Sequence, residues 1–150
     1  MQRLLLPVLA LLALSGGCRR DGPTDLAAGA SVRVTSDRAQ YSVAANDVAR
    51  VTITNESDRA VYLPMAQYVL HEHLVDGAWR DESSWFTVDG IGMSIEVPPG
   101  ATLTDGLSVA RYLVKGPGTY RFRYLVFADA QWRSPLPVDQ RVSAPFLVTP

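Results

Sequence analysis

The chain is nearly free of cysteine: Cys18 is the only one among its 150 residues. One cysteine cannot form an intramolecular disulfide, so a disulfide-stapled small domain is excluded and stability has to come from packing. Long apolar runs are also missing, because the longest, Leu4–Leu14, is too short to cross a bilayer as a helix.

Blocks of like charge are absent as well. Residues 1–17 contain one basic residue, Arg3, so the rest of the chain holds 14 − 1 = 13 basic against 15 acidic residues, a net charge of −2. Nucleic-acid binding and electrostatic attraction to lipid headgroups both require clustered basic residues. We therefore expect no nucleic-acid partner.

What is present at the N-terminus indicates export. Arg3 and the short apolar run after it are typical of a targeting segment covering residues 1–17. Ser15-Gly16-Gly17-Cys18 resembles the lipobox of bacterial lipoproteins, although the usual leucine stands one place early, at Leu14. The resemblance implies cleavage before Cys18 and a diacylglycerol on its sulfur. The alternative is an ordinary signal peptide followed by an unrelated cysteine.

Residues 18–30 are expected to form the lipidated cysteine and a flexible tether, because they are small, polar and without period. Arg19 follows the cysteine where an aspartate commonly signals inner-membrane retention in lipoproteins of diderm bacteria. The resemblance therefore favours the periplasmic face of the outer membrane over the inner membrane.

Residues 31–150 are expected to form one domain rich in short strands. Cutting after residue 17 leaves 150 − 17 = 133 residues, enough for one core. Apolar and polar residues alternate in many short segments, separated by turn residues, and no helical period is present. The pattern predicts an all-β fold, an immunoglobulin-like antiparallel β-sandwich of roughly seven to nine strands, with a small barrel as the alternative.

The strongest strand signal follows the turn Gly116-Pro117-Gly118. Four apolar residues then alternate with other side chains and predict one packed face: Tyr120, Phe122, Tyr124 and Val126. In immunoglobulin-like sandwiches a tyrosine after such a turn bonds back to upstream backbone. Tyr120 is expected to play that role, and Phe122 to fill the place of the second cysteine of an antibody domain. The intervening Arg121 and Arg123 are expected to form a solvated basic ridge.

Five short motifs within residues 41–128 together resemble a bacterial immunoglobulin-like domain found in lipoproteins. They are Asn55–Ser57, Tyr68–Leu70, Asp76–Trp79, Pro99-Gly100 and Pro117–Tyr120. The segment from Leu70 to the Asp76-Gly77 turn is one residue longer than is typical of that family. The resemblance implies a core position for Trp79, and it carries no catalytic residues.

Two groups of residues are candidate sites. His71 and His73 would project from one face of a strand and could hold copper or zinc, with Met65 or Met93 as soft partners for copper(I). The plainer alternative places Tyr68, Leu70 and Leu74 inside and both histidines in solvent. Trp85, Phe86 and Trp132 stand in irregular segments, where aromatic side chains either close one end of a sandwich or serve as binding anchors.

We expect a lipid-anchored accessory module of the cell envelope that binds a protein or glycan partner without catalysis or a cofactor. Exposed loop aromatics or an open sheet edge would meet the partner. No hydrolase or phosphate-binding pattern is present, since Gly92–Glu96 is not followed by a helix and Gly116–Gly118 opens a strand. The alternatives are a periplasmic metal-handling protein that uses His71 and His73, and a protease inhibitor.

Overall fold

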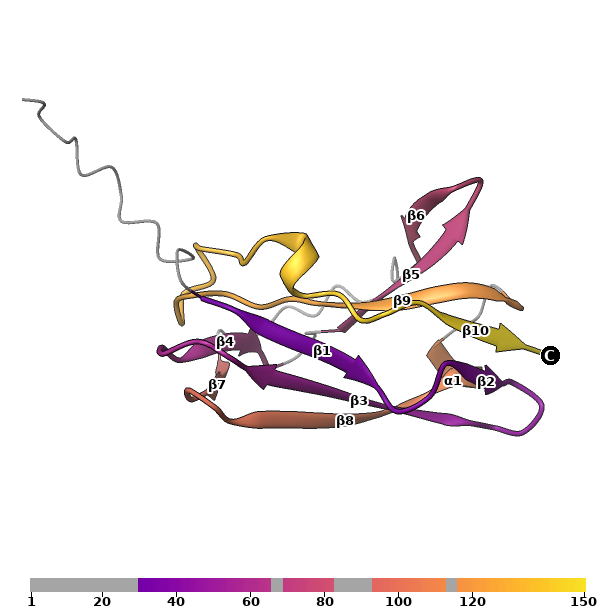
Figure 1. Ribbon diagram of the computed structural model, residues 1–150, viewed down its shortest axis with the longest axis horizontal. Helices are drawn as coiled ribbons and strands as arrows, with labels where there is room; N and C mark the ends of the chain where they lie inside the picture. The colour runs from indigo at the N-terminus through magenta and orange to yellow at the C-terminus, as the bar shows by residue number, and fades with distance from the viewer. Residues whose placement is uncertain (1–29, 66–68, 83–92, 113–115) are drawn as a thin grey trace, which may run out of the picture.

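The computed structural model describes residues 30–65, 69–82, 93–112 and 116–150, and these residues are mostly strand. Helical structure in these ranges is limited to α1 (Val109–Tyr112) and a 3₁₀ turn, η1 (Val138–Gln140). The ten strands, shown in Figure 1, are β1 (Val32–Ser36), β2 (Gln40–Ser42), β3 (Val48–Asn55), β4 (Val61–Pro64), β5 (Val69–Val75), β6 (Ala78–Asp81), β7 (Ser94–Val97), β8 (Thr102–Ser108), β9 (Gly118–Tyr124) and β10 (Phe146–Thr149). The all-β prediction is confirmed, and the described residues alone form ten strands, more than the seven to nine expected.

The strands form three sheets. One has the order β1-β3-β8, a second β2-β10-β9-β5-β6, and a two-stranded ribbon joins β4 to β7. The three-stranded sheet lies below the five-stranded sheet (Figure 1). All pairs are antiparallel except β2 with β10, which is parallel and corrects the purely antiparallel expectation.

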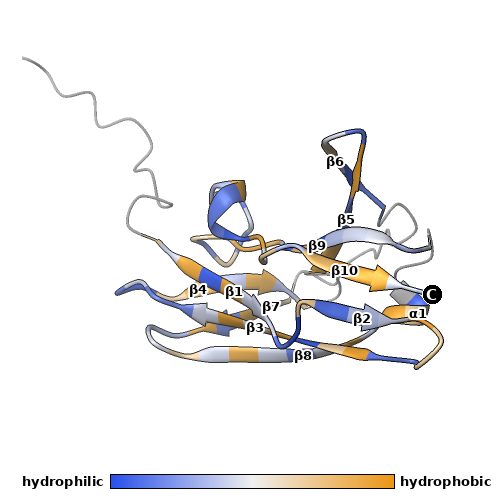
Figure 2. Ribbon diagram, turned by 45° about the vertical axis from the view of Figure 1, so that its right-hand side comes forward, coloured by the Kyte–Doolittle hydropathy of each residue, from blue (hydrophilic) through white to orange (hydrophobic). Residues whose placement is uncertain are grey.

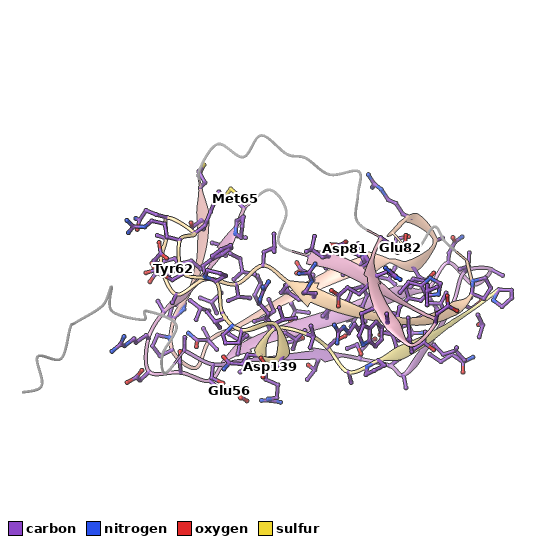
Figure 3. All side chains as sticks on the ribbon, turned by 90° about the horizontal axis from the view of Figure 1, so that it is seen from above. Glu56, Tyr62, Met65, Asp81, Glu82 and Asp139 are labelled. Atoms are coloured by element: carbon purple, nitrogen blue, oxygen red, sulfur yellow. The ribbon has the colours of Figure 1, made fainter. Side chains whose placement is uncertain are left out.

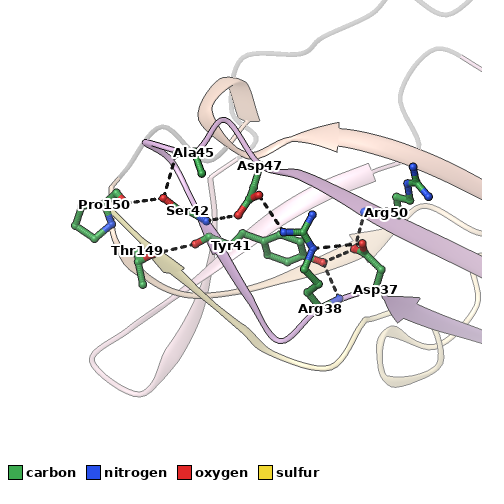
Figure 4. A network of polar contacts seen from close by, with 9 residues as sticks. All are labelled: Asp37, Arg38, Tyr41, Ser42, Ala45, Asp47, Arg50, Thr149 and Pro150. Carbon is green, nitrogen blue, oxygen red and sulfur yellow. Dashed lines mark hydrogen bonds and ion pairs between the residues drawn. The ribbon is translucent and has the colours of Figure 1, made fainter.

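The parallel pair arises because the chain changes sheets between β1 and β2. Asp37, in the crossing, accepts hydrogen bonds from the Tyr41 hydroxyl and from the Arg50 N–H, both at 2.8 Å (Figure 4). Arg38 pairs with Asp47 at 2.9 Å. Burial of the Tyr41 ring, together with its bond to Asp37, raises the pKa of Tyr41 to about 12. These polar contacts fix the crossing, and β1 and β2 thus close one side of both sheets.

The core lies between the two larger sheets. Buried and outward residues alternate on β1, β3 and β9, as a pleated strand requires. Figure 2 shows the alternation along β1 and β8 as orange bands separated by blue or white ones. On β9, Tyr120, Phe122 and Tyr124 are at most 1% exposed, and the Phe122 ring stacks 4.7 Å from that of Phe146. The predicted packed face of this strand is confirmed.

Tyr120 also makes the predicted backward bond. Its hydroxyl donates to the carbonyl oxygen of Gly116 at 2.7 Å, four residues upstream. The ring stacks on His73 at 4.4 Å with an interplanar angle of 7°. A Cβ at position 118 would overlap the Nε2 atom of His73, so a larger residue there would displace the imidazole from its place on the Tyr120 ring.

The chain on either side of β10 keeps β9 attached along its length. β10 pairs with residues 118–120 of β9, and Val142 bridges Arg123 further along. Residues 143–145 therefore lie opposite only two residues of β9, Arg121 and Phe122, which makes a β-bulge. Beyond β9, Phe127 exchanges two backbone bonds of 2.9 Å with Tyr62 and so ties the β4–β7 ribbon to the larger sheet.

Replacing Phe122 by alanine tests the core directly. We expect Phe122→Ala to lower the free energy of unfolding by roughly 3–5 kcal/mol, because it removes a fully buried aromatic ring. Leu147→Ala, on the neighbouring β10, is the matched control, since that side chain is 44% exposed, and should cost less than about 1 kcal/mol. Urea unfolding of both variants measures the difference, and equal midpoints would contradict the assigned face.

Candidate functional site

Three of the sequence-predicted site residues, Cys18, Trp85 and Phe86, lie outside the described residues. The other three, His71, His73 and Trp132, are described. They lie in two separate places, the histidines on β5 and Trp132 in the loop after β9.

Both histidines point toward the core side of the five-stranded sheet. His71 pairs with Phe122 across the strands and is 4% exposed, and its ring meets the Phe122 ring edge-on at 5.7 Å. His73 pairs with Tyr120. The expectation that Leu74 faces inward with the histidines in solvent is wrong, since Leu74 is 37% exposed. The two histidines do share one face of the strand, as predicted.

Burial dominates the chemistry of His71. It lowers the pKa of the imidazole to about 4, against a smaller opposing effect of the Asp81 carboxylate. At neutral pH the ring is therefore uncharged and serves as part of the aromatic packing around Phe122.

The two methionines lie elsewhere. Met65 and Met93 are neighbours at one end of the β4–β7 ribbon, where the Met65 N–H donates to the Met93 carbonyl oxygen at 2.9 Å. Figure 3 labels Met65 well apart from Asp81 and Glu82, which adjoin the histidine strand. Among the described residues, no three His, Cys, Asp or Glu side chains gather into a group suited to a metal ion.

The opposite face of β5 carries a buried carboxylate. Glu72 is 6% exposed and pairs with the Nε atoms of Arg121 at 2.6 Å and Arg123 at 2.8 Å. Arg123 also reaches Asp81 on β6 at 2.8 Å. Arg121 and Arg123 are thus held in ion pairs with 19% side-chain exposure, and the expected solvated ridge is wrong.

Trp79 belongs to this outer face. The Arg121 guanidinium lies 4.3 Å from the centre of the indole ring, a cation–π contact. Trp79 is only partly buried and pairs across the strands with Leu74, on the face that bears Glu72. The predicted core position for Trp79 is therefore wrong. The indole instead packs over the Glu72 ion pairs.

Trp132 lies in a loop that is held by several backbone hydrogen bonds. Its φ of 60° is unusual for a large side chain, and its backbone N–H donates to the carbonyl oxygen of Asp129. The Asp129 carboxylate accepts backbone bonds from Gln131, Arg133 and Ser134 at 2.7–3.1 Å. The Trp132 indole N–H donates to the Ser94 hydroxyl at 2.8 Å, which leaves the ring half-buried against the start of β7.

One further surface, the open edge of β8, was not predicted from the sequence. β3 is the only strand paired with β8 in the described chain. The Asn55 N–H donates to the Ala101 carbonyl oxygen, and the Val109 N–H donates to the Asp47 carbonyl oxygen. The odd-numbered residues of β8 therefore form the backbone hydrogen bonds to β3. Antiparallel alternation then directs the backbone N–H and C=O groups of even-numbered residues away from β3. These are Thr102, Thr104, Gly106 and Ser108, and we call this row of groups the open edge of β8.

This edge is the longest among the described edge strands. β8 has seven residues, against five in β1, four in β6 and three in β2. β6 presents charged side chains at Arg80 and Asp81, and β1 contacts η1. β8 carries no proline and only one charged residue, Asp105. Its backbone is therefore the strand edge best suited to pairing with another chain.

Comparison with known proteins assigns no family. No family model and no curated protein matches the sequence. Among solved structures, the DNA glycosylase AlkC of Pseudomonas fluorescens, bound to DNA containing an abasic-site analog, matches with a TM-score of 0.44 and 12% identity, over 81% of this chain and 31% of that one. A β-glucosidase of Listeria innocua in complex with glucose matches with a TM-score of 0.39 and 15% identity, over 81% and 16%. Both TM-scores lie below 0.5, and this chain spans less than a third of either protein, so neither carries an argument about activity.

The described part of the chain contains no helix with the length and apolar character that a membrane crossing requires.

The buried imidazole predicts a measurable acid sensitivity. With a folded pKa near 4 and an ordinary value of 6.5, the unfolded chain binds the proton first as the pH falls. Stability should therefore drop between pH 6.5 and pH 4, by roughly 3 kcal/mol in total from this group. His71→Leu, which cannot titrate, should lose that part of the decline in unfolding experiments at stepped pH. Parallel curves for both proteins would contradict the burial.

Neutralising the buried carboxylate should also destabilise the sheet. We expect Glu72→Gln to cost roughly 3 kcal/mol, because it leaves two partly buried guanidinium groups without their shared partner. Asp81→Asn is the matched control at a carboxylate whose side chain is 43% exposed, and it should cost less than about 1 kcal/mol. Urea unfolding compares the two, and a loss confined to Asp81→Asn would refute the assignment.

Proposed function

We propose that the protein is a lipid-anchored, immunoglobulin-like β-sandwich of a bacterial envelope that binds a protein or glycan partner without catalysing a reaction. The observation that carries the binding role is the open edge of β8. It is a row of backbone donors and acceptors on a strand that the core holds in place.

Two features support the immunoglobulin-like assignment. The Tyr120 hydroxyl bond to Gly116 has the form of the tyrosine corner that recurs in such domains. The first strand segment contributes β1 to one sheet and β2 to the other, and the core lies between these sheets. Both features are also compatible with the packing-based stability expected of a chain with one cysteine.

The buried charged side chains among the described residues are held in structural contacts, which supports binding over catalysis. Glu72 is engaged by Arg121 and Arg123, and Asp129 by three backbone N–H groups. Arg141 donates to the carbonyl oxygens of Leu136 and Tyr124. These charges brace loops and strands, and a reacting group would need access to a substrate.

The lipid anchor is proposed from the sequence around Cys18. The start of β1 and the C-terminus lie at opposite ends of the molecule (Figure 1), so a tether leading into β1 would leave the other end directed away from the membrane. β8 runs along the length between those ends, so a partner paired with its edge would lie beside the anchored domain.

Cys18→Ser should release the protein from membranes, because it removes the thiol that would carry the acyl chains. Each buried methylene contributes about 0.8 kcal/mol, so losing two or three chains abolishes durable attachment. The measurement is membrane flotation of the full chain, with Ser31→Ala, which lies outside the lipobox-like motif, as a control that keeps the cysteine. Unchanged flotation of Cys18→Ser would refute the anchor.

The binding role is tested separately. Crosslinking in intact envelopes at native expression should give a discrete crosslinked species, which should weaken when Cys18→Ser releases the protein. Absence of any crosslinked species in the anchored protein would contradict a role in binding.

A further inference from the structure

We propose that the open edge of β8 binds an extended peptide segment of a partner protein. In that segment the three side chains that face the core side of the sheet would be apolar, basic and apolar, in that order. The inference rests on the proposed binding function and specifies the partner of that function. The segment would pair antiparallel with β8 and add a fourth strand to the β1-β3-β8 sheet.

The backbone supplies the affinity. The open edge offers the N–H donors of Thr102, Thr104, Gly106 and Ser108 and the C=O acceptors of the first three. The Ser108 carbonyl precedes α1 and accepts the first bond of that helix. The side chains of these residues are small, uncharged and directed to the outer face, where the Thr104 hydroxyl lies 2.9 Å from that of Thr52. An incoming strand therefore meets no bulky or charged outward side chain on β8.

The inward-facing residues of β8 supply the selectivity. Leu103 and Leu107 are partly buried and pack against the core, so each leaves apolar surface beside the edge. Asp105 lies between them on the same face and accepts a hydrogen bond from the Tyr124 hydroxyl at 3.3 Å. Its carboxylate places a negative charge on this face of β8, and an opposite charge at the facing position of a neighbouring strand stabilises a strand pair.

Charge argues against a second copy of this chain as the occupant. Full antiparallel self-pairing of β8 would place the two copies of Asp105 directly opposite each other. Like charges in that position destabilise a strand pair, whereas opposite charges stabilise it. Asp105 thus discourages self-association through this edge and favours a partner with lysine or arginine at the facing position.

The probe is the labelled heptapeptide Thr-Val-Thr-Lys-Thr-Val-Thr, which places valine, lysine and valine opposite Leu107, Asp105 and Leu103. Its affinity for the full chain in detergent micelles is measured by fluorescence anisotropy. The matched peptide carries glutamate in place of lysine. The lysine peptide should bind at least about fivefold more tightly, because an opposite-charge pair replaces a like-charge pair. Equal affinities would overturn the assigned role of Asp105.

Three variants locate the site. Asp105→Asn should bring the two affinities within about twofold of each other, since it removes the charge. Thr104→Pro should abolish binding, because it deletes one N–H of the open edge while leaving the bonds to β3. Ser36→Pro is the matched control on β1, whose N–H at this position also points away from β3, and it should bind normally. Loss of binding in Ser36→Pro alone would assign the peptide to β1 and overturn the proposal.

A probe on the peptide side keeps the test decisive if Thr104→Pro does not fold. N-methylation of the peptide's threonines removes the backbone N–H donors that would face β8. This modification should abolish binding to the unmodified protein. Undiminished binding would overturn strand addition. Binding of a chitooligosaccharide, with both peptides inactive, would also overturn the peptide assignment while leaving the broader binding role intact.

The outcomes also separate this inference from the proposed function. An envelope crosslink that survives Thr104→Pro would refute the edge and leave the binding role standing. Absence of every envelope crosslink would refute the binding role itself, whatever the model peptide does.

Discussion

The packing of three aromatic rings along one face of β9 is the interaction on which the rest of the structure depends. Tyr120, Phe122 and Tyr124 are buried to within 1% of full burial, and Phe146 and the two histidines of β5 pack against this row. No disulfide can reinforce these contacts, since the chain has one cysteine. Dispersion and apolar burial therefore hold the two larger sheets together. The other face of the same strand carries Arg121 and Arg123, whose ion pairs with Glu72 fix β5 beside β9.

Much of this arrangement could be predicted from the sequence, because β9 has a clear period. Its apolar residues all fall on one set of alternate positions, so only one face can be the core face. The Tyr120 bond to Gly116 followed from the turn that precedes the strand. The apolar residues of β5 do not define one face, because Leu70 and Leu74 occupy one set of alternate positions and Val69 and Val75 occupy the other. A shift of one residue exchanges the faces of a strand, and the extra residue before the Asp76-Gly77 turn fits that shift.

The error on β5 propagated to its neighbours. Once the histidines face the core, Glu72 and Leu74 must face outward, and Trp79 follows because it pairs with Leu74. The ion pairs of Glu72 were invisible in the sequence, since 49 positions separate it from Arg121. Edge strands present the same difficulty. Thr102–Ser108 alternates like a central strand, and only the sheet order shows that no strand lies on its far side in the described chain. Sequence periodicity defines faces well, whereas it carries no information about edges.

The account thus joins a rigid aromatic core to an exposed strand edge, and amide hydrogen exchange tests that combination most directly. Residue-resolved NMR exchange should show strong protection at Phe122 and Tyr124, whose backbone N–H groups are bonded. Along β8, the amides of Leu103, Asp105 and Leu107 should be protected by β3, whereas those of Thr104 and Gly106 should exchange rapidly with water. Uniform protection along β8 would show that its edge is already covered, and rapid exchange at Phe122 and Tyr124 would contradict the core itself.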